Sequence, residues 1–246
     1  MAFSTIKDSF TFHPLGDAAI VIQAGTDISE EIHERVVQLF SCIEQHPFAG
    51  YVEAVQAFTN VTVFYEPYTV YQSAHQQDLS PYEWVKSYID TLIEEKWQER
   101  VQAKRRTIDI PVCYGGELGP DLEEVARINR LTPEEVVRIH TAGKYLVYMI
   151  GFAPGFPFLG GLSERIAAPR RESPRISIPK GSVGIAGKQT GVYPISTPGG
   201  WQLIGQTPLS LFRPDEKVPS LLRAGDEVRF VQMSEKEFFS MKEAER

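Results

Sequence analysis

Residues 151–205 read GFAPGFPFLGGLSERIAAPRRESPRISIPKGSVGIAGKQTGVYPISTPGGWQLIG, and this stretch decides the fold. It contains 11 of the 19 glycines and 7 of the 17 prolines of the chain. A long helix is excluded here, because proline removes a backbone donor and glycine lowers helix stability. Between these residues lie short apolar or alternating runs of the length of barrel strands, at 176–178, 183–186, 192–195 and 201–204. The stretch therefore predicts a small, closed β structure.

The same stretch also predicts a rigid ligand groove. Glycines let a ligand approach the backbone closely, and prolines hold loops in place before the ligand arrives. The expected walls are apolar, and they comprise Phe152, Pro154, Phe156, Phe158, Tyr193 and Trp201. These aromatic residues could instead fill the barrel, which is the favoured interpretation for Phe158. The expected polar points between them are Arg170, Arg171, Arg175, Lys188, Gln189, Thr190 and Thr197. Such a groove suits a small amide or carboxylate, or a peptide.

Three of these positions have a more specific chemistry. The guanidinium group of Arg175 can bind a carboxylate or phosphoryl group in a fork. A solvated rim is the alternative for these arginines, and it fits Arg175 less well because that residue leads into an apolar strand. Gln189 can donate to a carbonyl and accept from an amide N–H at the same time, which suits a lactam or a peptide. His140 precedes the stretch at a predicted helix end. It either interacts with the helix C-terminus or serves the groove as an acid or base.

Other catalytic motifs do not fit. The glycines at 181, 184 and 187 precede Lys188, but a phosphate-binding loop needs glycine at Ser182 and serine or threonine at Gln189. The nucleophile-elbow pattern GxSxG is absent from the sequence, and the five histidines lack the spacing of metal ligands. We therefore predict neither an ATP-binding loop, nor an autonomous hydrolase, nor a metal site in this chain.

Composition narrows the class of protein. The 246 residues have a net charge of −7 and a pI near 5.4, which disfavours nucleic-acid binding. Two distant cysteines, Cys42 and Cys113, fit a reducing compartment. Residues 145–163 carry no charge but are interrupted by glycine and proline, so a membrane span is not expected. With no secretory signal apparent at the start of the sequence, we predict a cytoplasmic protein.

Two domains are expected along the chain: a small α+β domain at 1–103 and a mainly β domain at 104–246. The first should contain strands at 9–13, 17–23, 51–58 and 61–65, with helices capped by Asp27 and by Ser80. The second should begin with a strand at 106–113, followed by helices at 121–129 and 133–140 and a strand at 145–150. Its last strand should be 227–232, and the charged residues 234–246 should fray.

Four runs of the sequence carry a resemblance to a known family. They are GFAPGFPFLGGL (151–162), PRRESPR (169–175), IPKGSVGIAGKQTGVYPISTPGGWQLIGQTP (178–208) and LLRAGDEVRF (221–230). With IPVCYGGELGPDLEEVA (110–126) and NVTVFYEP (60–67), the likeness extends over nearly the whole chain. On these runs the chain resembles the allophanate-hydrolase subunit 1 family. The resemblance implies that the C-terminal domain is a cyclophilin-like β-barrel.

The resemblance also implies two functions. The first is a non-autonomous subunit of an ATP-dependent 5-oxoprolinase, which works with A-type and C-type partner subunits and whose ATP site is not assigned to this chain. Arg175 would then pair with the substrate carboxylate, while Gln189 and Thr190 hold the lactam. The second is an inhibitor that binds a sporulation histidine kinase and blocks its autophosphorylation, with Phe152, Phe156 and Trp201 as anchors. The two functions are compatible, and the sequence leaves a homo-oligomer open.

Overall fold

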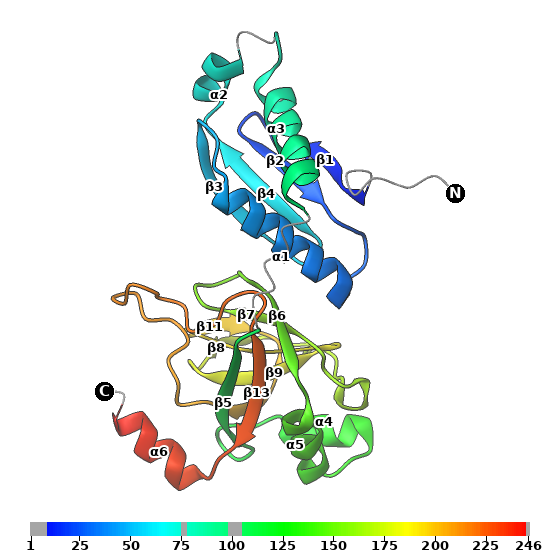
Figure 1. Ribbon diagram of the computed structural model, residues 1–246. Coiled ribbons are helices and arrows are strands. Elements are labelled where there is room, and N and C mark those ends of the chain that lie inside the picture. The colour runs from blue at the N-terminus through cyan, green and yellow to red at the C-terminus, as the bar shows by residue number, and fades with distance from the viewer. Residues whose placement is uncertain (1–8, 75–77, 98–104, 245–246) are drawn as a thin grey trace. The chain divides into compact units, whose positions relative to one another are not determined.

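The computed structural model describes residues 9–74, 78–97 and 105–244 (Figure 1). The chain divides into two compact units, Met1–Lys104 and Arg105–Arg246. The predicted boundary between residues 103 and 104 lies outside the described residues. An α+β unit is followed by a unit built around a closed barrel, which confirms the predicted fold class.

The first unit is a four-stranded antiparallel sheet covered by helices. The strands lie in the order β1 (Thr11–Pro14), β2 (Ala19–Gln23), β4 (Asn60–Tyr65) and β3 (Tyr51–Gln56). Two helices, α1 (Glu30–Gln45) and α3 (Pro81–Lys96), pack on one face of the sheet (Figure 1). Because apolar side chains recur every three or four residues, each helix buries one stripe against the sheet. The buried residues include Ile20, Ile22, Val36, Leu39, Val61, Val63, Ile89 and Ile93.

Local capping sets the helix starts in this unit. Ser80, Pro81 and Glu83 form the predicted capping box of α3. The predicted cap of α1 is wrong, because the hydroxyl of Ser29 and not the carboxylate of Asp27 accepts from the third helical N–H, that of Ile32. A short helix that the sequence pattern did not reveal, α2 (Pro67–Ala74), follows β4.

The second unit is a closed seven-stranded barrel in the order β10, β7, β6, β13, β5, β12 and β9. The strands are β5 (Thr107–Tyr114), β6 (Tyr145–Ile150), β7 (Pro157–Gly160), β9 (Ser182–Ala186), β10 (Gln189–Val192), β12 (Gln202–Gln206) and β13 (Glu227–Gln232). β5 and β13 are parallel, and the other barrel pairs are antiparallel. Beside the barrel, β8 (Arg175–Ile178) pairs with β11 (Thr197–Gly199).

Helices complete this unit. α4 (Leu122–Asn129) packs against β12, and α5 (Pro133–Ala142) packs against β13. A 3₁₀ turn, η2 (Glu164–Ile166), follows β7 and lies against both helices. Thr132, Pro133 and Glu135 form a second capping box, at the start of α5.

Two predictions for this unit are wrong. The strand expected at 192–195 is displaced to 189–192, because Pro194 has no N–H with which to continue the ladder. The tail expected to fray forms α6 (Glu235–Ala244). Its first turn is held by reciprocal hydrogen bonds between Ser234 and Glu237, and Phe238 is completely buried. Burial of this aromatic side chain stabilises a helix that the charged composition of the segment did not indicate.

Gly181 and Gly187 both adopt left-handed backbone angles, with φ of 83° and 58°. A Cβ at Gly181 would lie 2.3 Å from the carbonyl oxygen of Thr207, whereas one at Gly187 would meet nothing within 4 Å. We expect Gly181→Ala to lower the free energy of unfolding by about 2 kcal/mol more than Gly187→Ala, since both share the backbone strain and only the first adds a clash with backbone. Urea denaturation of both variants measures this difference, and equal losses would contradict it.

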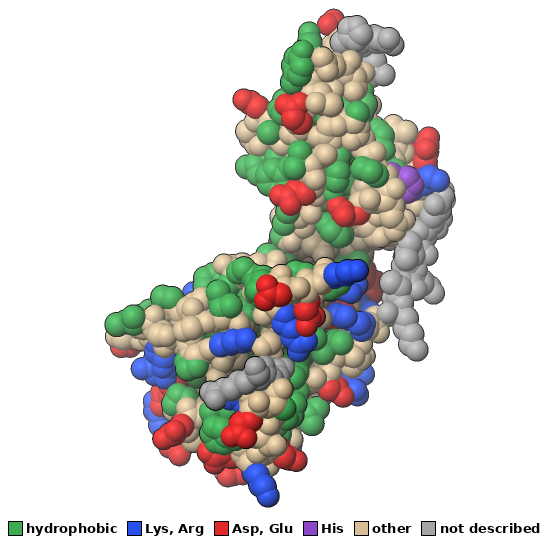
Figure 2. All heavy atoms as spheres, turned by 90° about the vertical axis from the view of Figure 1, so that its left-hand side faces the viewer, with side chains coloured by type: hydrophobic (Ala, Val, Ile, Leu, Met, Phe, Trp, Pro, Cys, Tyr) green, Lys and Arg blue, Asp and Glu red, His purple; other side chains and the backbone are tan. Residues whose placement is uncertain are grey.

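The surface of the barrel unit carries charged side chains of both signs. Figure 2 shows acidic and basic side chains interspersed over the visible face of the barrel unit. No helix in the described ranges has the length and apolar character needed to cross a bilayer.

Candidate functional site

Most of the predicted aromatic walls are buried. Phe156, Tyr193 and Trp201 pack with Ile178, Ala186 and Leu203 into a small apolar cluster. The ring of Phe156 lies edge-on to those of Tyr193 and Trp201, with centroids 5.5 and 5.8 Å apart. The prediction that these rings line an open groove is therefore wrong. Edge-to-face aromatic packing satisfies them within the protein.

Of the other two predicted aromatic walls, Phe158 is half-buried and Phe152 is exposed. The side chain of Phe152 is 71% exposed, and it lies edge-on to Phe156 with centroids 5.4 Å apart. Its φ of 66° places a bulky residue in the left-handed region, which such residues rarely adopt. The neighbouring Pro154 is also exposed. This loop is the apolar part of the predicted groove that reaches solvent.

The predicted triplet Lys188, Gln189 and Thr190 does not present three polar groups to one ligand. The ammonium group of Lys188 forms an exposed ion pair with Glu164. Gln189 is half-buried at the start of β10, whereas Thr190 is completely buried. Consecutive strand residues point to opposite faces, which explains the separation. The prediction that Gln189 and Thr190 together hold a lactam is therefore wrong for Thr190.

His140 lies in the interior of the barrel unit, with no exposed surface. Its ring stacks on Phe230, with centroids 4.4 Å apart, and its Nε2 lies 3.0 Å from the hydroxyl of Thr190. That hydroxyl donates to the carbonyl of Gly184, so it accepts from Nε2–H. The hydroxyl of Tyr114, 2.8 Å from Nδ1, then donates to the ring. Neither predicted role, at the helix end or in a groove, describes this closed internal network.

Burial sets the protonation of this network. Desolvation lowers the pKa of His140 to about 3. It raises the pKa of the Tyr114 hydroxyl well above its usual value. Both side chains are therefore neutral near neutral pH, and His140 is not poised to exchange a proton there.

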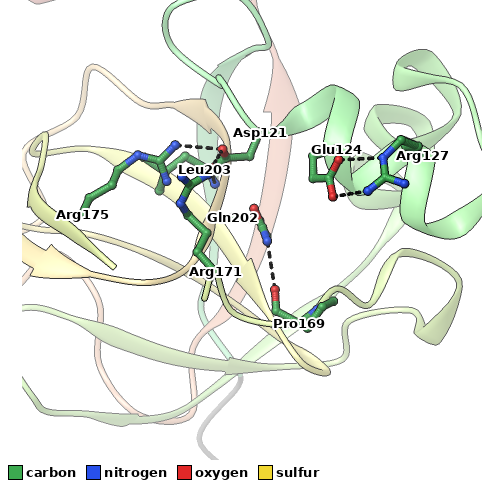
Figure 3. A network of polar contacts seen from close by, with 8 residues as sticks. All are labelled: Asp121, Glu124, Arg127, Pro169, Arg171, Arg175, Gln202 and Leu203. Carbon is green, nitrogen blue, oxygen red and sulfur yellow. Dashed lines mark hydrogen bonds and ion pairs between the residues drawn. The ribbon is translucent and has the colours of Figure 1, made fainter. Parts of the chain in front are cut away.

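Asp121, which sequence analysis missed, organises a polar site with two of the predicted arginines. Its Oδ1 accepts from Arg171 Nη1 at 3.0 Å and from Arg175 Nη2 at 2.8 Å, and its Oδ2 accepts from the backbone N–H of Leu203 at 2.7 Å (Figure 3). Asp121 precedes α4 but makes no side-chain cap to that helix. Its sequence position indicates an ordinary cap, so no local signal could reveal its distant partners. We call Asp121, Arg171 and Arg175 the arginine–aspartate cluster.

The backbone around this cluster is stiff. Pro169 and Pro174 flank the arginines, and the N–H of Arg171 donates to the carbonyl of Gly200 at 2.8 Å. The amide of Gln202 donates to the carbonyl of Pro169 at 3.0 Å (Figure 3). These bonds fasten the 169–175 segment to the start of β12. The site is therefore formed before a ligand arrives, which lowers the entropy lost on binding.

The remaining polar candidates lie around the cluster. Burial raises the pKa of Tyr193 to about 12, against the opposing effect of the positive charges of Arg170 and Arg175. Thr197 is half-buried on β11, next to β8. The structure thus brings Arg171 and Arg175 together at Asp121, and the charges of Arg170 and Arg175 act on Tyr193. The chemistry of these arginines is the recognition of an anion.

Two structural features bear on cofactor binding. The described residues contain no group of three or more histidine, cysteine, aspartate or glutamate side chains that could hold a metal ion. The glycines at 181, 184 and 187 belong to strands and turns of the barrel, and a strand follows them in place of the helix of a phosphate-binding loop.

Solved structures share this fold. The crystal structure of TTHA0988 matches with a TM-score of 0.74 and 32% identity, over 88% of this chain and 40% of that chain. The conserved uncharacterized protein PH0987 from Pyrococcus horikoshii matches with a TM-score of 0.53 and 46% identity, over 93% of this chain and all of that chain. This chain thus spans less than half of TTHA0988.

Sequence comparisons identify a relative whose name states a function. The B-type subunit of 5-oxoprolinase from Bacillus subtilis (strain 168) is 58% identical over 234 residues, which cover 95% of this chain and 97% of that protein. This similarity confirms the family resemblance seen in the motifs. Residues 10–222 match the family model described as "Carboxyltransferase domain, subdomain C and D". The chain therefore belongs to the family of carboxyltransferase domains, subdomains C and D.

Proposed function

We propose that this chain is the B-type subunit of an ATP-dependent 5-oxoprolinase, which converts 5-oxoproline to L-glutamate in the cytoplasm with A-type and C-type partner subunits. The observation that supports this proposal is the 58% identity, over almost the full length of both chains, with a protein named as the B-type subunit of 5-oxoprolinase. The word subunit in that name supports a role in a larger assembly.

The chemistry requires more than the arginine–aspartate cluster offers. Opening an unstrained lactam is difficult because its amide is stabilised by resonance, and transfer of a phosphoryl group from ATP to the amide oxygen would activate it for attack by water. The arginine–aspartate cluster offers charge and hydrogen bonds, but no nucleophile activated by an adjacent base. We propose that this chain binds and orients the substrate through Arg175 and that its partners supply the ATP site.

Reconstitution tests this function. The purified chain alone should not convert 5-oxoproline, whereas the chain combined with its A-type and C-type partners should release glutamate and ADP in equal amounts. Omission of ATP, or of any one subunit, provides the control. Turnover by the chain alone would contradict its non-autonomous role, and a complete complex without turnover would contradict the proposed reaction.

The kinase-inhibitor alternative stays a prediction. Two of its three expected anchors, Phe156 and Trp201, are buried in the apolar cluster, and only Phe152 is exposed. An autophosphorylation assay of a sporulation histidine kinase, with and without the chain, separates this alternative from the oxoprolinase function. Phe152→Ala should weaken inhibition if the remaining anchor is used.

A further inference from the structure

The arginine–aspartate cluster carries more positive than negative charge. Two guanidinium groups face one carboxylate, which leaves a formal charge of +1. The Asp121 side chain is 5% exposed, whereas those of Arg171 and Arg175 are 37% and 23% exposed. The cluster therefore lies at the protein surface, with its negative member on the inner side. This arrangement leaves the arginines accessible to a solute anion.

Several polar atoms in and beside the cluster have no hydrogen-bond partner among the described residues. Arg171 Nε and Arg175 Nη1 are buried, and the described residues provide no acceptor for either N–H. Gln202 is 5% exposed, and while its Nε2 is bonded to Pro169, its Oε1 has no donor in the described part of the chain. Native proteins leave few such groups unpaired, because each one lowers stability. Two donors and one acceptor in one small region thus call for a functional explanation.

The segments that carry Gln202 and Arg171 are hydrogen-bonded to each other. Gln202 is bonded to Pro169, two residues before Arg171, and Arg171 is bonded to Gly200, two residues before Gln202. Figure 3 shows Gln202 and both arginines around Asp121. Asp121 fixes Arg171 and Arg175 by a shared oxygen, so it acts as a positioning residue for both guanidinium groups.

We propose that this cluster is a binding site for a small carboxylic acid that carries an adjacent amide N–H. The carboxylate accepts from Arg171 and Arg175, and the carbonyl of Gln202 accepts from the ligand's N–H. This inference rests on the proposed function for the identity of the ligand, because 5-oxoproline has both groups. It replaces the predicted partners Gln189 and Thr190 with Gln202.

A carboxylate suits the site better than a phosphate does. The planar fork of arginine matches the two oxygens of a carboxylate. The carboxylate of Asp121 and the carbonyl of Gln202 would repel the additional anionic oxygens of a phosphate.

Calorimetric titration of the full chain, alone and in complex with its partner subunits, tests the site. We expect 5-oxoproline to bind, and its uncharged carboxamide and inorganic phosphate to bind at least about tenfold more weakly. The lactone 5-oxotetrahydrofuran-2-carboxylate has a ring oxygen in place of the N–H. It should bind about tenfold more weakly, because that oxygen faces the Gln202 carbonyl without a donor.

Single substitutions test whether 5-oxoproline binds in the arginine–aspartate cluster. Arg171→Gln and Arg175→Gln should each weaken 5-oxoproline binding about tenfold or more, and Arg175→Lys should weaken it less because the charge opposite Asp121 is kept. Arg127→Gln is the matched control, since Arg127 forms an exposed ion pair with Glu124 on the adjacent helix. It should leave binding unchanged. Thermal unfolding of each variant confirms that it is folded.

Several results would overturn the inference. The first is that the wild type and a folded Arg175→Gln variant bind 5-oxoproline with equal affinity. The second is that 5-oxoproline and its carboxamide bind with equal affinity. The third is that neither the chain alone nor the complex binds 5-oxoproline. Tighter binding of phosphate would also overturn it. If the complex turns over 5-oxoproline with an unchanged KM in both arginine variants, the proposed function stands and this site fails. If carboxylates bind through Arg175 but the complex shows no turnover, the site stands and the proposed reaction fails.

Discussion

Asp121→Ala is expected to lower the free energy of unfolding of the barrel unit by about 3 kcal/mol. The substitution removes the counter-charge of two partly buried guanidinium groups and the acceptor for the Leu203 N–H. Uncompensated charge and an unpaired backbone donor both destabilise a folded protein. Urea denaturation followed by circular dichroism measures the loss, and amide hydrogen exchange at Leu203 should accelerate.

Two further variants make this prediction specific. Asp121→Asn keeps an acceptor for Leu203 but loses the charge, so its loss of stability should be smaller than that of the alanine variant. Glu124→Ala removes the carboxylate of the exposed pair with Arg127, and because solvent screens that pair it should lower stability much less than Asp121→Ala does. If Asp121→Ala is no more destabilising than Glu124→Ala, the cluster does not hold the 169–175 segment in place.

The second large effect is a dependence of stability on pH through His140. Its pKa is about 3 in the folded state and near 6.5 when exposed, so below pH 6.5 only the unfolded state takes up the proton. The free energy of unfolding should therefore fall by roughly 1.4 kcal/mol per pH unit from this group as the pH decreases from 6.5. The loss ends near pH 3, where the folded state is also protonated.

His140→Gln isolates this contribution. Glutamine can donate to Thr190 and accept from Tyr114, as the neutral imidazole does, but it does not titrate. Denaturation from about pH 7.5 to about 4.5 should show a stability curve that is flatter for this variant by about 2 to 3 kcal/mol. His13→Gln, which replaces an exposed residue of β1, should give the wild-type curve. Parallel curves for the wild type and His140→Gln would show that the buried ring does not govern acid stability.

Local sequence patterns predicted much of the fold. The residues at Ser80 and Thr132 predict the first residues of their helices, because a capping box joins groups three positions apart. Alternating apolar residues place β5, and the density of glycine and proline predicts the barrel. The helix α6 escaped notice because one buried residue, Phe238, anchors an otherwise charged segment.

The candidate site was harder to predict because burial depends on what covers a residue. Phe156 and Trp201 have the composition of groove walls, but 45 positions apart in the chain they meet edge-on and bury each other. The alternation of side chains along β10 separates Gln189 from Thr190. Among the predicted polar residues, Arg171 and Arg175 meet at Asp121, which the sequence did not connect with them.

The sequence by itself determined the family, the barrel and the arginine-rich segment held between prolines, because these depend on residue types and on interactions between near neighbours. The tertiary structure decided which side chains act together. Asp121 reaches Arg171, Arg175 and Leu203 across 50, 54 and 82 positions, and His140 reaches Thr190 across 50. A carboxylate and a guanidinium at such separations pair only when barrel closure brings their strands and loops together, so no local pattern of residues can reveal them.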